Sequence, residues 1–206
     1  MNLAVAATTF ILVIPAELPD KTFISSVVLA SRHRPLPVWT GASAALVLQA
    51  ALAVVAGHLL GLLPHVLVES IISAAFIGGA LYLLFVPQKA AEARAEEIAA
   101  EEEGELERAP RAERSFWRIT LTTFTVIALA EFGDITQVLI ANLTARYRDG
   151  PAVFVGASVA FLVVAAVGVL AGRTITRWAP ISLIRKLSGL ALLALGIYTI
   201  VGLATG

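Results

Sequence analysis

Two short segments of the chain each combine a pair of carboxylates with a threonine. Residues 17–22 read Glu-Leu-Pro-Asp-Lys-Thr, and residues 131–136 read Glu-Phe-Gly-Asp-Ile-Thr. Both lie inside long apolar runs, where an acidic side chain costs roughly 2.5–3.5 kcal/mol on membrane-insertion scales. Ionisable groups kept at that cost usually mark an ion or proton path. We therefore predict that four acids form one cation site: Glu17, Asp20, Glu131 and Asp134.

The spacing and the side chains of the two motifs favour a hard divalent cation. Acids three residues apart share one face of a helix, so each motif can present both of its carboxylates together. The hydroxyls of Thr22 and Thr136 add oxygen donors, and backbone carbonyls would join them if the helices open at Pro19 and Gly133. Sites built only from oxygen suit calcium, magnesium and manganese.

The charges of the motifs link the cation to protons. Four ionised carboxylates and Lys21 sum to −3, a charge that a low-dielectric site cannot hold without a counter-ion. A divalent cation reduces this sum to −1. Without the cation, one or more acids should be protonated, because like charges at close range disfavour ionisation. We therefore expect metal and protons to displace one another, with Lys21 tuning the charge of the site.

Other polar residues also lie within the apolar runs. Gln49, Gln137 and Asn142 either line the path or form hydrogen bonds between helices, and Ser25, one turn beyond Asp20, is open to the same two interpretations. We include Ser25, Gln49 and Gln137 as supporting residues of the metal and proton path.

The composition is that of a polytopic membrane protein. The 206 residues are 58% hydrophobic, the mean hydropathy is +0.86, and the apolar runs reach the roughly 20 residues that cross a bilayer. The absence of cysteine excludes disulfides, thiolate metal sites and thiol catalysis. With no large soluble portion and no Ser-His arrangement near the acids, we expect neither an enzyme nor a nucleic-acid-binding protein. We expect no cofactor apart from the transported ion, and a homo-oligomer is compatible with the sequence.

The apolar runs predict an all-α integral membrane protein with six transmembrane helices. The predicted spans are residues 3–30, 37–63, 66–86, 119–145, 151–172 and 187–203. Nine of the fifteen acidic residues lie between Glu92 and Glu113, in a stretch rich in Ala, Glu and Arg that is typical of a charged linker. The predicted organisation is a three-helix unit at 1–86, a linker at 87–117 and a second three-helix unit at 118–206.

The two units are repeats of one another. Five residues of the first unit recur 114 positions later in the second unit. In order, Glu17, Asp20, Thr22, Arg32 and Arg34 correspond to Glu131, Asp134, Thr136, Arg146 and Arg148. Two glycines recur at an offset of 115, Gly41 as Gly156 and Gly57 as Gly172, and we expect them to allow close helix packing. Because each unit has an odd number of helices, the two enter the membrane in opposite senses. Inverted repeats of this kind place their substrate near the bilayer midplane.

The basic residues orient these helices, because Lys and Arg are enriched in cytoplasmic segments. With the N-terminus outside, twelve basic residues lie in cytoplasmic segments and only Arg146 and Arg148 lie in outer ones. We therefore predict a protein of the bacterial plasma (inner) membrane with both termini outside and the linker in the cytoplasm. The N-terminal segment lacks the basic residues of a secretory signal, so we expect the first apolar run to be a retained membrane helix.

At the two motifs the sequence resembles the GDT family of small membrane cation exchangers. The signature of that family is a duplicated E-x-G-D-[KR]-[ST] on two inverted three-helix repeats, and the resemblance covers nearly the whole chain. It implies exchange of calcium or manganese for protons, with the motif acids as ligands. Pro19 replaces the glycine of the first motif, and Ile135 replaces the basic residue of the second. These departures bear on metal preference and coupling rather than on cation binding.

The predicted function is that of a divalent-cation transporter, a cation:proton antiporter that exports Mn²⁺ or Ca²⁺ from the cytoplasm. Two alternatives are compatible with the sequence. An exporter of small organic solutes such as amino acids would need aromatic or basic groups at mid-depth, where only Lys21 is available. A non-transporting structural or assembly protein would use the acids to pair helices, with Lys21 as a static counter-ion, but Ile135 removes that partner from the second motif.

Overall fold

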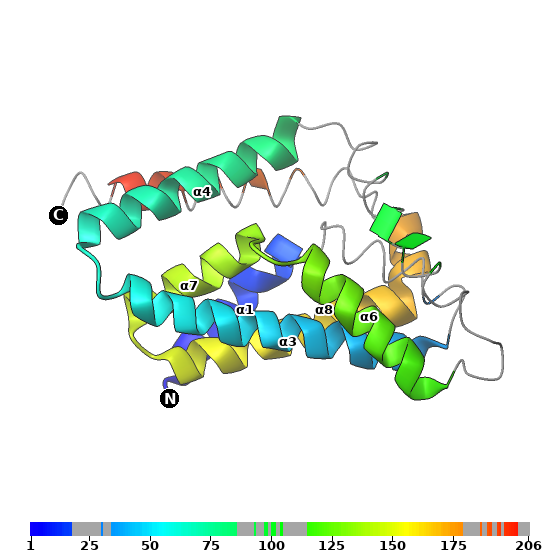
Figure 1. The fold of residues 1–206 in the computed structure, drawn as a ribbon. Helices are drawn as coiled ribbons and strands as arrows, with labels where there is room; N and C mark the ends of the chain where they lie inside the picture. Colours follow the sequence, from blue (N-terminus) through cyan, green and yellow to red (C-terminus); the bar gives the residue numbers. More distant parts are fainter. Residues whose placement is uncertain are drawn as a thin grey trace.

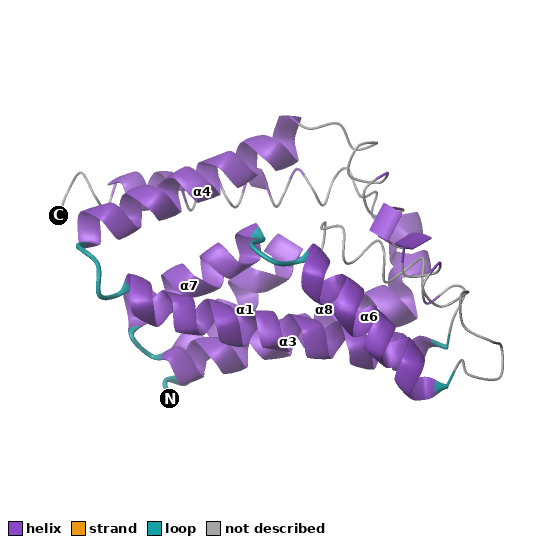
Figure 2. Ribbon diagram, in the orientation of Figure 1, coloured by secondary structure: helices purple, strands orange, loops and turns teal. Residues whose placement is uncertain are grey.

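Figures 1 and 2 show the protein as a computed structural model in which every described regular element is a helix. The structure describes residues 1–17, 30, 34–85, 93, 97–98, 100–101, 104, 115–178, 186, 189–190, 193–194 and 196–201. Four predicted site residues lie outside this part of the chain, namely Asp20, Lys21, Thr22 and Ser25, and so does most of the predicted linker.

The labelled helices in the described residues are α1 (Leu3–Glu17), α3 (Pro35–Leu60), α4 (His65–Phe85), α6 (Phe116–Ala130), α7 (Ile135–Tyr147) and α8 (Gly150–Trp178). The apolar pattern predicted the bounds of the second and third spans to within three residues. The fifth span is longer than predicted, because α8 continues to Trp178, and residues 196–201 of the sixth are helical. The second half of the predicted first span lies almost entirely outside the described residues.

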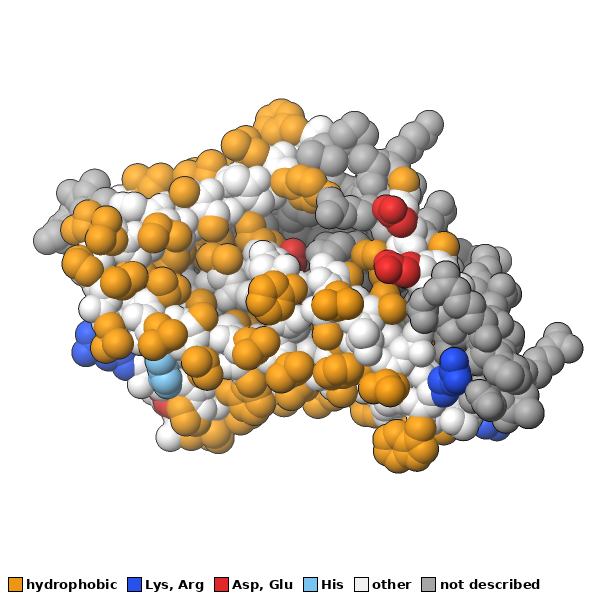
Figure 3. Space-filling model, in the orientation of Figure 1, with side chains coloured by type: hydrophobic (Ala, Val, Ile, Leu, Met, Phe, Trp, Pro, Cys, Tyr) orange, Lys and Arg blue, Asp and Glu red, His pale blue; other side chains and the backbone are white. Residues whose placement is uncertain are grey.

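Two of these helices, Pro35–Leu60 and Gly150–Leu170, are long and apolar enough to cross a membrane, and α6 with α7 makes a third if this bent pair is one span. Apolar side chains cover the middle of the face seen in Figure 3, while Lys and Arg side chains lie toward its two ends. Apolar surface on this scale is typical of a protein that faces lipid rather than water.

Helix α3 lies at the centre of the packing. It contacts α6, α7 and α8, whereas α1 packs against α8 and α7. The interfaces are filled by small and branched side chains, of which Val13, Ala42, Ala45 and Leu46 are at most 2% exposed. Helix α4 lies against α7, on the side of α7 away from α8 (Figure 1).

Gly41 and Gly156 each pack closely against a helix from the other half of the chain, and the two contacts match. A methyl group added at Gly41 on α3 would overlap a backbone carbonyl of α6 and lie 2.8 Å from Thr123 Cβ. A methyl group added at Gly156 on α8 would overlap a backbone carbonyl of α1 and lie 2.9 Å from Thr9 Cβ. The close packing predicted at both glycines is confirmed, and so is that predicted at Gly57, where an added methyl group would overlap the Ala141 carbonyl of α7. Thr9 and Thr123 are themselves 114 residues apart, a match that the sequence reading missed.

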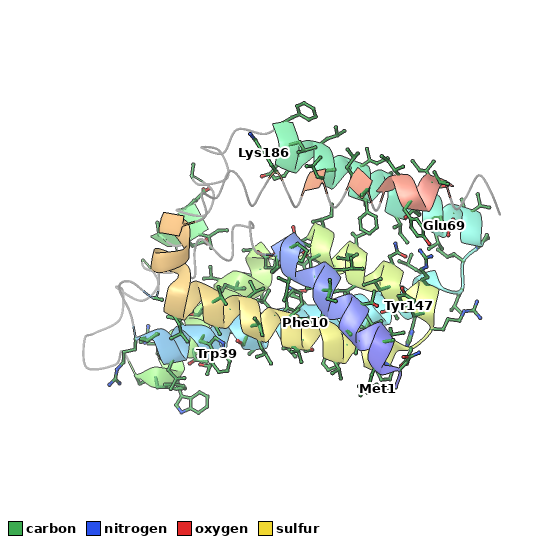
Figure 4. The ribbon with its side chains drawn as sticks, turned by 180° about the vertical axis from the view of Figure 1, so that it is seen from behind. Met1, Phe10, Trp39, Glu69, Tyr147 and Lys186 are labelled. Carbon is green, nitrogen blue, oxygen red and sulfur yellow. The ribbon has the colours of Figure 1, made fainter. Side chains whose placement is uncertain are left out.

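Hydrogen bonds join the starts of α1 and α8 at one end of the molecule. Asp149 Oδ1 accepts the Ala152 N–H at 3.2 Å, and Asp149 Oδ2 accepts the Asn2 N–H at 2.7 Å. Figure 4 shows Met1 and Tyr147 at this end and Trp39 toward the other. The N-terminus and the loop between α7 and α8 therefore lie on the same side of the protein.

Candidate cation site

The second motif interrupts its helix. Helix α6 ends at Ala130, α7 begins at Ile135, and the chain bends by 75° between them. Gly133 has a φ of 79°, in the left-handed region where the absence of Cβ removes the steric penalty. Asp134 caps α7, because its Oδ2 accepts the Thr136 N–H at 3.4 Å. The span predicted as one run over residues 119–145 is thus two helices joined by a turn.

This break corrects the reason for grouping Glu131 with Asp134. The spacing predicted that both acids share one helical face, but Glu131 caps the C-terminal end of α6 and Asp134 caps the N-terminal end of α7. Apolar residues flank the turn on both sides, so hydrophobic periodicity could not locate it. Its local signals were Gly133 and Asp134, a residue type common at helix N-caps. Glu131 is 2% exposed and Asp134 is half-buried. The N-terminus of α7 favours a carboxylate through its partial positive charge.

Glu17 and Thr136 bring the two motifs into contact. The Thr136 hydroxyl donates a hydrogen bond to Glu17 Oε2 over 2.9 Å, between residues 119 positions apart in the chain. Both side chains are buried, with 1% of Glu17 and 3% of Thr136 exposed. Glu17 is the last residue of α1, so the start of the first motif lies against the first turn of α7.

Gln49 and Gln137 are bonded to one another and to the backbone of the turn. Gln137 Nε2 donates to Gln49 Oε1 at 2.9 Å and to the Glu131 carbonyl at 2.6 Å, and Gln137 Oε1 accepts the Gly133 N–H at 3.2 Å. Gln49 Nε2 donates to the Ala128 carbonyl at 2.7 Å. Of the two interpretations of these glutamines, their contacts support hydrogen bonding between helices. The sequence identified both residues but contained no signal for their partners.

The described residues contain part of the predicted four-acid set. Among them, no three His, Asp or Glu side chains lie close enough together to hold a metal ion, and Asp20 is not among the residues that the structure describes. The structure brings Glu17 to Thr136 and Gln49 to Gln137, and Glu131 and Asp134 flank the turn that these contacts adjoin. A site made by all four acids stays a prediction.

Asn142, the third polar residue of the apolar runs, borders a cavity at the Tyr147 end of the molecule. The cavity measures about 310 Å³ and lies beside α4 and α7; its polar lining residues are Glu69, Asn142, Arg146, Arg148 and Thr199. Arg146 donates to the Tyr198 hydroxyl at 2.8 Å, and its guanidinium lies 5.0 Å from the centre of that ring. This contact ties the end of α7 to the last helical segment.

Long apolar helices with buried carboxylates at a broken helix define a membrane-type protein that has an internal polar site, as transporters do. The sequence matches the family described as "Divalent cation/proton antiporter GDT1" over residues 5–90 and 119–205. The chain belongs to this family, which is one of transporters rather than enzymes. The resemblance seen at the two motifs is confirmed.

Individual relatives cover different shares of the chain. "GDT1-like protein 1, chloroplastic" of Oryza sativa subsp. indica is 43% identical over 79 residues, which are 38% of this chain and 22% of that protein. "Protein PAM71, chloroplastic" of Arabidopsis thaliana is 42% identical over 85 residues, 41% of this chain and 22% of that protein. The chain thus spans about a fifth of the length of these chloroplast relatives.

A bacterial relative is similar along almost its whole length. "Putative manganese exporter" of Vibrio cholerae is 30% identical over 207 aligned positions, which cover 98% of this chain and 89% of that protein. No solved structure shows significant similarity to the chain.

Proposed function

We propose that the protein is a divalent cation:proton antiporter that exports Mn²⁺ or Ca²⁺ from the cytoplasm. The observation that carries this proposal is the contact between the two motifs, in which the buried Glu17 carboxylate accepts the Thr136 hydroxyl at 2.9 Å. Membership of the GDT1 family supports exchange of a divalent cation for protons. The name of the Vibrio cholerae relative supports manganese as the ion and export as the direction.

The proposed ligands are Glu17, Asp20, Glu131 and Asp134, with Thr22 and Thr136 as supporting ligands. Glu17 and Glu131 are 1% and 2% exposed, so a charged carboxylate at either position depends on partners within the protein. A divalent cation is one such partner, and a proton removes the charge altogether. The same oxygens would therefore bind the metal in one step and protons in the other, with Lys21, Ser25 and the two glutamines as supporting groups.

The architecture that we propose is six transmembrane helices as two inverted three-helix repeats, residues 1–86 and 118–206, joined by the linker at 87–117. Helix α1 of the first half packs on α8 of the second, and α6 of the second packs on α3 of the first. The matching contacts at Gly156 and Gly41 support the same two-fold relation. Rocking of one repeat against the other would then expose a site near the midplane to each side in turn.

The proposed orientation places both termini outside the plasma membrane and the linker in the cytoplasm. The hydrogen bond between Asn2 and Asp149 supports a common side for the N-terminus and the loop that precedes α8. Arg34 and Ser115 precede α3 and α6, whose N-terminal parts contact one another through the hydroxyls of Thr40 and Thr120. We assign this second end to the cytoplasm because the topology predicted from the sequence places twelve basic residues in the segments on this side and two on the other.

Cation-dependent proton flux in proteoliposomes tests the proposal. A Mn²⁺ or Ca²⁺ gradient should drive proton movement in the opposite direction, and Mg²⁺ and Na⁺ gradients give the selectivity. Glu17→Gln and Asp134→Asn should each abolish this flux while the protein still inserts into the bilayer. Unchanged flux in Asp134→Asn would overturn the four-acid site. Proton flux driven only by an amino-acid gradient would support the organic-solute alternative. The absence of both proton flux and metal binding would support the structural alternative.

A further inference from the structure

The turn between α6 and α7 leaves backbone groups without their helical partners. In a continuous helix the Ala128 carbonyl would accept the Phe132 N–H, but that N–H donates to the Leu129 carbonyl at 3.4 Å. The Gly133 N–H likewise loses its place in the helical ladder, because the chain turns at this residue. Water is scarce inside a membrane, so such groups need partners from the protein itself.

The side-chain amides of Gln49 and Gln137 supply such partners, and they add a second donor to the Glu131 carbonyl, which also accepts the Asp134 N–H at 3.2 Å. Gln49 Nε2 binds the Ala128 carbonyl, while Gln137 binds the Glu131 carbonyl through Nε2 and the Gly133 N–H through Oε1. The amide-to-amide bond of 2.9 Å joins the two side chains into one chain of hydrogen bonds, which we call the glutamine clamp. The clamp holds the turn at three backbone positions.

The hydrogen bonds of the clamp are compatible with only one orientation of each side-chain amide. The Gly133 N–H can only donate, so the Gln137 oxygen must face it and the Gln137 nitrogen must face the Glu131 carbonyl. That nitrogen then meets the oxygen of Gln49, and the Gln49 nitrogen is left to meet the Ala128 carbonyl. Because backbone groups fix both ends, neither amide can flip without placing like groups against each other. Each amide is therefore held in one orientation against the turn.

The clamp belongs to the second motif alone. At the repeat offsets, the position matching Gln137 is Phe23 and the position matching Gln49 is Val164. Neither side chain can donate or accept a hydrogen bond. The first motif, which contains Pro19, thus lacks the residues that would build the same clamp.

We propose that Gln49 and Gln137 are positioning residues that hold the Glu131–Asp134 turn in the shape that binds the cation. The inference rests on the proposed function, since it assigns the turn a cation. Glu131 and Asp134 flank the clamped residues, so a shift of the turn would move both carboxylates. Groups that orient metal ligands are worth about 10- to 100-fold in metal affinity. Gln49 lies on α3 in the first half of the chain. The clamp therefore also makes the shape of the second motif depend on the position of the first half relative to the second.

Two measurements on the purified full-length protein in detergent test this role. The first is Mn²⁺ affinity by isothermal titration, and the second is hydrogen exchange of the peptide that spans residues 128–137, which needs no metal. Gln137→Met, which keeps the length of the side chain, should weaken Mn²⁺ binding about tenfold and speed exchange in this peptide. Gln49→Met should have a smaller effect on both, because it leaves the two bonds from Gln137 to the turn intact.

The matched control is Thr125→Val. The Thr125 hydroxyl donates to the Leu121 carbonyl of its own helix at 2.9 Å, so this variant removes a hydrogen bond from α6 without touching the clamp. It should bind Mn²⁺ and exchange as the wild type does. The double variant should bind little more weakly than Gln137→Met alone, because the two glutamines share a bond.

Wild-type affinity together with wild-type exchange in Gln137→Met would overturn the clamp. If Gln137→Met does not fold, Gln49→Met decides by the same two measurements. A wild-type protein that binds neither Mn²⁺ nor Ca²⁺ would overturn the proposed function instead. Hydrogen exchange alone would then test the clamp. Faster exchange in Gln137→Met than in the wild type would support a turn that the clamp holds in place, and unchanged exchange would overturn it.

Discussion

Gly41 and Gly156 occupy matched positions on α3 and α8, and each lies against a threonine of the opposite half of the chain. Thr123 packs at Gly41 and Thr9 packs at Gly156, and both threonines are fully buried. Glycine lets two helix backbones approach closely, and the resulting van der Waals packing is one of the forces that associate helices in lipid. The two contacts are therefore matched parts of the interface between the halves.

Alanine at either glycine should destabilise the protein. The added methyl group would overlap a backbone carbonyl of the facing helix, and overpacking of this kind costs about 1–3 kcal/mol. We expect Gly41→Ala and Gly156→Ala each to lower the apparent melting temperature in detergent. Gly78→Ala on α4 is the control, since nothing lies within 4 Å of the added methyl group. An equal loss at all three positions would show that the glycines act through the helix backbone and not through the interface.

Thr136→Val tests the contact between the motifs. Valine keeps the shape of threonine but removes the hydroxyl that donates to Glu17 Oε2. Loss of a group that orients a metal ligand typically weakens metal binding about tenfold or more, so we expect that loss in Mn²⁺ affinity measured by titration. Thr136→Ser keeps the donor and should restore most of the affinity.

Thr144→Val supplies the comparison for that experiment. Thr144 lies on the same helix and is equally buried, but its hydroxyl donates to the Ile140 carbonyl of its own helix at 2.9 Å. The change should leave Mn²⁺ affinity intact. A similar loss of affinity in both valine variants would argue for general damage to α7 and against a role of the Glu17 contact.

The sequence predicted the long helices well because their signal is local. The bounds of α3 and α4 follow from long, mainly apolar runs closed by Pro35, Pro64 or a change in composition. The repeat offset predicted the glycine contacts for a different reason, since two equivalent halves must meet through equivalent surfaces. Both inferences needed only the order of residue types.

The sequence supplied the candidate residues of the site but did not predict the local geometry of the second motif. Two long-range partners lie beside the bend: Gln49 bonds to the Ala128 carbonyl and to Gln137, and Glu17 bonds to Thr136. They lie 84 and 116 positions before Gly133 in the chain, and no local pattern encodes such partners. For this reason the helical-face argument for Glu131 and Asp134 failed, while the choice of both acids and of both glutamines as site residues was compatible with the fold. The i, i+3 spacing holds only where the helix continues.

Asp149, in the loop between α7 and α8, should make the stability of the fold depend on pH in the acid range. The pKa of its carboxyl lies below the ordinary value of 3.8, chiefly because the carboxylate accepts the Asn2 N–H, with the Ala152 N–H acting in the same direction. A lowered pKa in the folded state stabilises the fold above the unfolded value, and this contribution is lost as the pH falls through the folded value. Stabilisation by Asp149 should therefore be complete above pH 3.8 and fade below it.

Asp149→Asn should show this pattern as a difference from the wild type. The variant should melt at a lower temperature at neutral pH, and the gap should narrow as the pH falls below about 4 and close only below the lowered pKa of the folded state, where the wild-type carboxylate is itself protonated. Melting curves in detergent at several pH values measure it. A gap that stays constant down to the lowest pH would mean that the carboxylate charge contributes nothing.

The absence of cysteine makes the orientation of the chain directly measurable. A single introduced thiol is then the only target for a membrane-impermeant maleimide. Leu62 is 82% exposed in the turn between α3 and α4, and exposed Ser115 precedes α6 at the other end of the molecule. We expect Leu62→Cys to be labelled on intact cells and Ser115→Cys to be labelled only after the membrane is permeabilised. Labelling of both from outside would contradict a bilayer between these two ends. The opposite pattern would keep the architecture but reverse the orientation, and with it the assignment of the Glu-rich linker to the cytoplasm.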